Sequence, residues 1–302
     1  MNKKPTRCLL LFKFSLVIVL FFCGDVFSQE QQKIRGQVSI PDSNHVQVIK
    51  TTDGSSLLGR ITEIRESEIQ FEGDFGSMTI AISKIKEIKE IPVTAIKKGG
   101  YWFPNPNVSR LFFAPTSRML KQGEGYFADI YLFFPGFAYG VTDNITIGGG
   151  MSLIPGVDIE DQIFYFTPKI GVQSSKDVSF AVGALLIALP DIDNDSPFAG
   201  ILYGGATFGT SDKSLSVGLG YGFVDDDFAD KPMLLVGGEA RVSRRVSLVS
   251  ENWVLPGVED AIISYGVRFF GEKLSVDLAL LNTLGEDFFF PGLPYVDFVF
   301  NF

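Results

Sequence analysis

Hydrophobic and polar residues alternate along many segments of about ten residues in the second two-thirds of the chain. In residues 213–223, the odd-numbered positions from 215 carry Leu215, Val217, Leu219, Tyr221 and Phe223. Serine and glycine occupy the even-numbered positions of the same segment. Because successive side chains of a strand point to opposite sides of a sheet, this pattern predicts strands with one bulky apolar face and one small face. Residues 164–172, 263–269 and 274–280 alternate in the same way.

The small face favours a membrane barrel over a soluble sandwich. Water-facing strand positions usually carry Lys, Glu, Thr or Arg, whereas this chain places glycine at 218, 220 and 222. Small and polar residues suit a confined lumen, and bulky residues suit a lipid-facing surface. We therefore expect the bulky face to contact hydrocarbon. The rival fold, a secreted soluble sandwich, predicts that the same bulky residues point inward.

The connections between the predicted strands alternate between short and long. The pattern predicts about twelve strands, at residues 107–115, 124–141, 144–155, 161–173, 177–189, 197–209, 213–224, 232–243, 245–255, 259–270, 273–283 and 293–302. An even strand number with short turns on one side and long loops on the other is typical of outer-membrane barrels. Both ends of such a barrel face the periplasm.

The first 28 residues are typical of a secretory signal peptide. Lys3, Lys4 and Arg7 precede an uncharged run at 14–23, and Ser28 offers a small residue at the cleavage site. The alternatives are an N-terminal anchor helix and a lipoprotein signal that lipidates Cys23. Both cysteines of the chain lie in this segment, so we expect no disulfide and no thiolate metal site in the remainder.

Residues 29–98 are predicted to form a small β module. Short β-like runs within residues 45–91 are separated by turn signals such as Asp53-Gly54, which predicts a small SH3-like or Sm-like barrel. Residues 48–54 followed by Gly59-Arg60-Ile61 resemble the first half of an Sm-type motif, and this resemblance implies a fold only. Residues 97–100 are typical of a linker.

Composition excludes several functions. Lys and Arg total 26 against 35 Asp and Glu, a formal charge of −9, which argues against nucleic acid as a partner. His45 is the only histidine, so we expect no enzyme, no cofactor and no histidine-based metal site. Asp191, Asp193 and Asp195 could present oxygens to Ca²⁺, but their loop lacks the glycine and distal glutamate of a calcium-binding loop. Solvated loop charge is the alternative.

Ionisable residues of the small face are predicted to line the lumen. They are Asp129, Lys169, Glu239, Arg241, Glu251, Arg268, Asp277 and Asp297. Because their signs are mixed, we expect them to pair inside a filled or very narrow lumen. A pore lining is the alternative, since a barrel of about twelve strands lies between the filled eight-strand size and the open sixteen-strand size.

Two resemblances add to this interpretation. The alternating residues Val296, Phe298, Phe300 and Phe302 resemble the C-terminal strand signal of outer-membrane proteins, which implies recognition by the barrel-assembly machinery. Residues 101–107, 110–116, 125–127 and 142–150 resemble uncharacterised outer-membrane β-barrel proteins of Gram-negative bacteria. This second resemblance covers most of residues 45–302. It implies a fold and a location, and it implies no reaction and no ligand.

We therefore predict an all-β chain with a signal peptide at 1–28, a periplasmic module at 29–98 and a transmembrane antiparallel barrel at 99–302. The expected function is a structural envelope component or a narrow passive pore in contact with membrane lipids. The second hypothesis is a membrane-anchored protein that binds a periplasmic protein partner through the module. A membrane-embedded enzyme is the third, and no catalytic residues support it.

Overall fold

The computed structural model describes residues 36–190, 198–285 and 290–302, and the chain divides into two units between Trp102 and Phe103. The predicted signal peptide lies outside the described residues, as do Asp191, Asp193 and Asp195. No helix among the described residues has the length and apolar character needed to cross a bilayer.

The N-terminal unit contains a five-stranded antiparallel sheet in the order β4-β3-β2-β1-β5. Its strands are β1 His45–Thr51, β2 Ser56–Ile64, β3 Glu68–Gly73, β4 Gly76–Ala81 and β5 Ile85–Pro92. The 3₁₀ turn η1, Ile82–Lys84, leads into β5, which returns to pair with β1. Ile49, Ile61, Ile69 and Phe71 are fully buried in the core of this unit. Strands therefore lie where the turn signals predicted them.

A tight hairpin occupies the positions of the predicted linker. The 3₁₀ turn η2, Val93–Ala95, precedes β6 Ile96–Lys97, which pairs with β7 Gly100–Tyr101. The two residues between these strands, Lys98 and Gly99, have φ angles of 51° and 73°. Positive φ at both central positions is the geometry of a two-residue hairpin turn, which explains the glycine. The residues predicted as a linker, 97–100, therefore form a hairpin at the end of the N-terminal unit.

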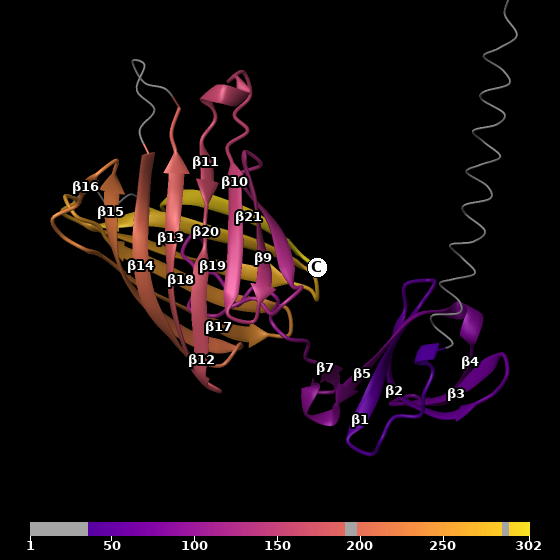
Figure 1. Cartoon of the computed structure of the whole chain (residues 1–302). Coiled ribbons are helices and arrows are strands. Elements are labelled where there is room, and N and C mark those ends of the chain that lie inside the picture. The colour runs from indigo at the N-terminus through magenta and orange to yellow at the C-terminus, as the bar shows by residue number, and fades with distance from the viewer. Residues whose placement is uncertain (1–35, 191–197, 286–289) are drawn as a thin grey trace, which may run out of the picture. The chain divides into compact units, whose positions relative to one another are not determined.

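The C-terminal unit is a closed antiparallel barrel (Figure 1). Its wall strands are β8 Gly125–Ile130, β9 Phe134–Thr142, β10 Ile145–Met151, β11 Phe164–Phe166, β12 Lys169–Ser175, β13 Val178–Ala188, β14 Phe198–Gly209, β15 Lys213–Val224, β17 Met233–Ser243, β18 Val246–Val254, β19 Ala261–Phe270, β20 Leu274–Leu284 and β21 Leu293–Asn301. The short β16, Asp227–Phe228, pairs with β15, and the 3₁₀ turn η3, Ile159–Asp161, lies in the β10–β11 connection. Pairing of β21 with β8 closes the sheet.

The barrel has twelve positions around its wall, because β11 and β12 together occupy one place between β10 and β13. The predicted number is confirmed, although two predicted strands differ. Residues 124–141 form β8 and most of β9 instead of one strand, and residues 107–115 form no strand. The turn that separates β8 from β9 uses Tyr131 and Leu132 at φ angles of 57° and 65°. Bulky residues rarely adopt this conformation, so the sequence carried no turn signal there.

The two rims of the barrel differ. Connections at one rim are short, at residues 143–144, 176–177, 210–212, 244–245 and 271–273. The other rim carries the longer connections 152–163, 189–197, 225–232, 255–260 and 285–292, together with the short link 131–133. The first and last strands meet at the short-turn rim, where Gly125 N donates to the Phe302 carbonyl at 3.1 Å. The predicted alternation of short and long connections is therefore present.

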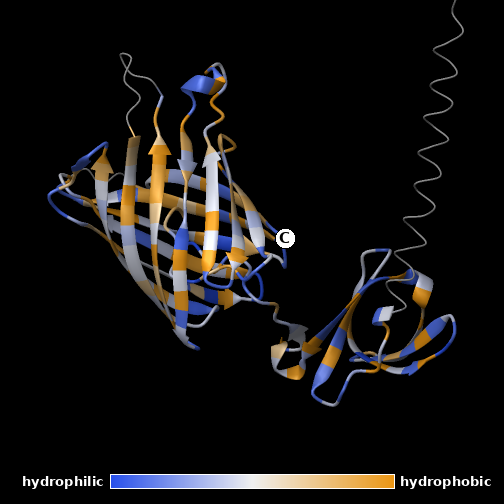
Figure 2. Cartoon of the chain, in the orientation of Figure 1, coloured by the Kyte–Doolittle hydropathy of each residue, from blue (hydrophilic) through white to orange (hydrophobic). Residues whose placement is uncertain are grey.

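The bulky side chains of the wall point outward, as the alternation predicted. Leu215, Val217, Leu219 and Tyr221 of β15 are 50%, 37%, 47% and 40% exposed, whereas Ser216 is 2% exposed. Apolar and polar positions alternate along the wall strands in Figure 2. A soluble sandwich would bury these residues against a second sheet, so the structure excludes that fold.

Outward-facing aromatic residues gather toward both rims. Phe127, Phe137, Phe180, Phe208, Phe269 and Phe300 are exposed toward the short-turn rim. Phe164, Phe166, Phe198, Tyr221 and Phe228 are exposed toward the long-loop rim. Two aromatic girdles that flank an apolar band are typical of a barrel that spans a bilayer.

We predict that an arginine on the apolar band destabilises the barrel according to its depth. Leu219 lies near the middle of β15, so Leu219→Arg is expected to cost about 2–4 kcal/mol of unfolding free energy. Leu284, which is 63% exposed at the long-loop end of β20, provides the matched control, and Leu284→Arg is expected to cost about 0–1 kcal/mol. Urea titration in lipid vesicles measures both values. Equal losses at the two positions would show that hydrocarbon does not surround β15.

Candidate functional site

The outer surface and the closure of the barrel indicate the medium that surrounds it. In hydrocarbon every backbone polar group must be satisfied within the protein, and a closed sheet does this because it has no free edge. The wall combines that closure with an apolar outside and an even number of strands. The C-terminal unit is an outer-membrane-type barrel.

A segment of the chain fills the lumen of this barrel. It comprises residues 103–123, which precede β8, and we refer to it as the plug. Its buried residues include Asn105, Asn107, Ser109, Arg110, Leu111, Phe112, Ala114, Thr116, Ser117 and Leu120. Their side chains and backbone make the contacts with inward-facing wall residues that are described below. The predicted strand at 107–115 is therefore wrong, because these residues lie inside the wall instead of forming part of it.

Both ends of the plug lie at the short-turn rim. At its start, the Phe103 carbonyl accepts from Arg241 Nη1 at 2.8 Å, and Arg241 also bonds Asp212 Oδ1 at 2.9 Å in the β14–β15 turn. At its end, Gln122 N donates to Asp143 Oδ1 at 2.9 Å in the β9–β10 turn. The plug therefore enters the lumen, turns within it and returns to the rim where it began.

Arg268 of β19 is the central anchor of the plug. Its Nε and Nη2 bond the two oxygens of Asp277 at 2.7 and 2.8 Å, and its Nη1 bonds Glu239 Oε2 at 2.9 Å. The same guanidinium donates to three plug carbonyls, those of Asn107 at 3.0 Å, Arg110 at 3.4 Å and Leu111 at 2.6 Å. These contacts use all five N–H donors of the side chain, so a fully buried charge is fully satisfied.

Glu251 of β18 holds the tip of the plug. Its Oε2 accepts from three consecutive backbone amides, those of Phe112, Phe113 and Ala114, at 2.8, 3.0 and 3.0 Å. Its Oε1 accepts from the Trp253 indole at 2.8 Å. A cluster of amides that converges on one carboxylate resembles the anion-binding nests of tight turns, and here it fixes the turn at 111–114.

Two further cationic side chains join the plug to the wall, one from the plug and one from the wall. Arg110 of the plug pairs with Asp297 of β21 and donates to the Phe112 carbonyl at 2.6 Å. Lys169 of β12 donates to the plug carbonyls of Thr116 and Arg118 at 3.0 and 2.8 Å. The wall thus holds the plug through side chains from several strands.

The structure places seven of the eight predicted lumen residues on the inner face. Lys169, Glu239, Arg241, Glu251, Arg268, Asp277 and Asp297 contact the plug or a residue that contacts it. Asp129 is the exception, because its register partner is the outward-facing Phe298 of β21. It lies two residues before the β8–β9 turn, and its Oδ1 is buried without a hydrogen-bond partner among the described residues. The lumen prediction is wrong for Asp129.

The four residues of the predicted assembly signal lie on or next to β21. Phe298, Phe300 and Phe302 are 39%, 50% and 58% exposed, and Val296 shares their parity along the chain. The inward positions between them are Asp297 and the fully buried Val299. Recognition of this strand by an assembly machinery stays a prediction.

One group of side chains in the N-terminal unit has metal-ligand types. Asp42, His45 and Glu90 each place one ligand atom within 4.8 Å of the others. His45 Nδ1 contacts Asp42 Oδ1 at 2.8 Å and Glu90 Oε1 at 3.9 Å. The hydrogen bond from His45 lowers the pKa of the Asp42 carboxyl. One ring nitrogen therefore faces both carboxylates, and the group is a small polar cluster at the surface of the N-terminal unit.

Comparison with protein-family models finds no match, and comparison with curated proteins finds none. Solved structures similar to this chain include OmpT of Vibrio cholerae with loop L8 deleted, at 9% identity and a TM-score of 0.32, covering 86% of this chain and 97% of that chain. OmpF of Salmonella typhi in complex with daunomycin has 9% identity and a TM-score of 0.32, covering 86% and 96%. OccD1 (OprD) has 7% identity and a TM-score of 0.33, covering 86% and 93%. The interpretation of this chain therefore depends on its own barrel surface and lumen.

Proposed function

We propose that the protein is an outer-membrane barrel closed by its own plug, which acts as a structural component of the envelope instead of an open pore. The observation that carries this proposal is the burial of the plug. Asn107 and Phe112 of the plug are 0% exposed, as are their wall partners Glu251, Arg268 and Asp277. Water does not reach these residues from the lumen or from the membrane side, so no hydrated path runs beside them.

The plug is held too firmly to act as a loose obstruction. Its backbone is bonded by Glu251, Arg268 and Lys169, which lie on different strands of the wall. Each of these bonds involves a charged group in a dry interior, where hydrogen bonds to charges are worth about 1.5–3 kcal/mol. Several bonds must break together before the plug leaves the lumen.

Electrical recording tests the proposal. Single wild-type barrels in planar bilayers are expected to show no stepwise current, because ions have no hydrated path through the lumen. The control for insertion is trypsin protection of the barrel in vesicles made from the same preparation. Regular current steps from protected wild-type protein would contradict a closed lumen.

The orientation and processing of the chain follow as parts of the same proposal. Residues 1–28 direct secretion, the assembly machinery inserts the barrel in the outer membrane of a Gram-negative bacterium, and residues 29–98 remain in the periplasm. The short-turn rim supports this orientation, because barrels of this type place short turns at the periplasmic side.

A second candidate function is partner binding by the N-terminal unit, which we propose to be a small SH3-like module. Phe75 favours it, because this residue is 99% exposed at the β3–β4 turn. Exposed aromatic residues are enriched where proteins bind one another.

Phe75→Ser tests the docking proposal. The variant is expected to lose cross-linking to a periplasmic protein without losing stability, because the phenyl ring contacts solvent. The neighbouring substitution Asp74→Ser is the matched control, and it is expected to keep the cross-link. Equal cross-linking yields from both variants would show that Phe75 does not contribute to docking.

A further inference from the structure

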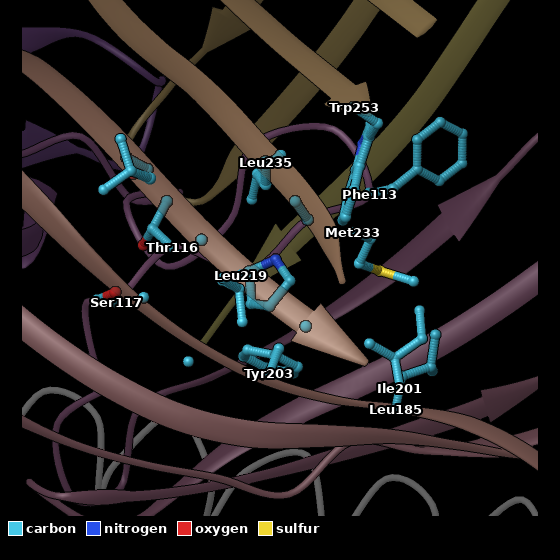
Figure 3. A pocket seen from close by; sticks show the side chains of 18 residues that line it. Phe113, Thr116, Ser117, Leu185, Ile201, Tyr203, Leu219, Met233, Leu235 and Trp253 are labelled. Atoms are coloured by element: carbon cyan, nitrogen blue, oxygen red, sulfur yellow. The ribbon is translucent and has the colours of Figure 1, made fainter. Parts of the chain in front are cut away.

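An apolar pocket lies inside the barrel beside the tip of the plug. Its volume is 180 Å³. Plug residues 113–117 form one side, and β13, β14, β15, β17 and β18 contribute the wall. Figure 3 shows the side chains of Leu185, Ile201, Met233, Leu235 and Trp253 around the space, with Phe113 of the plug beside Trp253.

Glycines on the inner face of the wall create the space. Gly218 and Gly220 of β15 and Gly205 of β14 line the pocket, and each has the parity of the inward-facing residues on its strand. A Cβ at Gly218 would meet Leu235 at 3.5 Å, which is ordinary van der Waals contact, so nothing in the local packing demands a glycine there. At Gly218, therefore, the pocket occupies space that a side chain could fill.

The chemistry of the lining is apolar and uncharged. No charged side chain lines the pocket in the part of the chain that the structure describes. The polar groups beside it already have partners: Trp253 Nε1 donates to Glu251 at 2.8 Å, the Ser216 hydroxyl bonds Thr207 at 2.9 Å, and the Thr116 hydroxyl donates to the Val108 carbonyl at 2.7 Å. A charged solute would lose its hydration here without compensation.

The pocket lies toward the long-loop rim of the barrel. Leu185, Ile201, Met233 and Trp253 lie within a few residues of the long-loop ends of their strands. The plug fills the lumen on the short-turn side of them. Phe113, at the plug tip, is 47% exposed, so open space reaches the floor of the pocket. A ligand therefore enters from the long-loop rim.

We propose that this pocket binds an uncharged apolar molecule the size of a single aromatic ring. An apolar cavity of about 150 Å³ lined by Leu, Ile and Phe stays dry and binds benzene, and the present pocket is of comparable size and lining. The aromatic faces of Trp253 and Phe113 suit a flat ring. This binding is independent of whether the barrel conducts.

Quenching of Trp253 fluorescence by nitrobenzene tests the proposal. The chain has 2 tryptophans, so Trp102→Phe leaves Trp253 as the single reporter in the full-length protein. Nitrobenzene is an uncharged ring with one hydrogen-bond acceptor, and contact with an indole quenches its emission. We expect saturable quenching in the Trp102→Phe protein. The charged analogue nitrobenzenesulfonate is expected to give no saturable component.

Two substitutions in this background distinguish the pocket from the surrounding lipid. Gly218→Leu fills the pocket and is expected to abolish the saturable component. Leu215→Phe lies on the outer face of β15, does not line the pocket, and is expected to keep the saturable component. Quenching that rises linearly with nitrobenzene in every protein, or that saturates equally in both variants, would overturn the proposal. If Gly218→Leu does not fold, the saturable or linear response of the Trp102→Phe protein and its selectivity against the charged analogue decide the question.

Discussion

A barrel whose plug is replaced by a flexible chain is expected to conduct ions. The replacement exchanges residues 105–119 for a Gly-Ser segment of equal length, which keeps the link between the two units. A Gly-Ser chain behaves as a hydrated random coil and makes none of the bonds to Glu251, Arg268 or Lys169 that hold the native plug. Water then enters a barrel whose twelve wall strands give a wider interior than a filled eight-strand barrel.

Single-channel recording in planar bilayers measures the effect, with the electrically silent wild type as the reference. A Gly-Ser replacement of residues 256–259, in the connection between β18 and β19, controls for the presence of a Gly-Ser segment and for handling. It is expected to stay silent, because that loop lies at the long-loop rim and outside the lumen. If the plug replacement inserts with trypsin-protected strands and stays silent as well, the plug does not close the lumen.

Removal of the Arg268 guanidinium is expected to cause the largest loss of stability from a single substitution. Arg268→Met keeps much of the side-chain volume but leaves Asp277 and Glu239 in a dry interior without their cationic partner. Loss of one member of a buried ion pair costs about 3–5 kcal/mol, because the remaining charge stays uncompensated. Three plug carbonyls, those of Asn107, Arg110 and Leu111, also lose their bond to this side chain.

Urea unfolding of the protein in lipid vesicles, followed by tryptophan fluorescence, measures this loss. Lys213→Met removes a cation from an exposed position at the start of β15 and is expected to change the free energy by less than about 0.5 kcal/mol. Adding Asp277→Leu to Arg268→Met should recover part of the loss, since it removes the carboxylate that was left unpaired. An Arg268→Met protein as stable as the Lys213→Met control would show that the network does not anchor the plug.

Alternation along a strand is a local property, and the features that depend on it were predictable. The two faces of β15 and the inward direction of Arg268 and Asp277 follow from counting positions. The pairing of Arg268 with Glu239 does not, because 29 residues separate them and no strand pattern specifies the height at which two strands align. The sequence therefore predicts which charged residues face the lumen, but it does not predict which of them pair with one another.

The plug escaped prediction for a related reason. Leu111, Phe112 and Ala114 are apolar and buried, as core residues of a strand would be. These plug residues are buried because a closed wall surrounds them. The wall closes only through the pairing of β21 with β8, which are far apart in the sequence. The predicted strand count agreed only because the unrecognised β8–β9 turn compensated for the strand that the plug does not form.

The return of the plug to its own rim has a topological consequence. Because the hairpin at 103–123 goes in and comes out at the short-turn side, the plug does not pass from one face of the membrane to the other through the barrel. Its path therefore permits either order of assembly: the wall can wrap around a hairpin already in place, or a finished wall can admit it afterwards. The same geometry lets the hairpin withdraw as a unit once its bonds are broken, without opening the seam between the first and last strands.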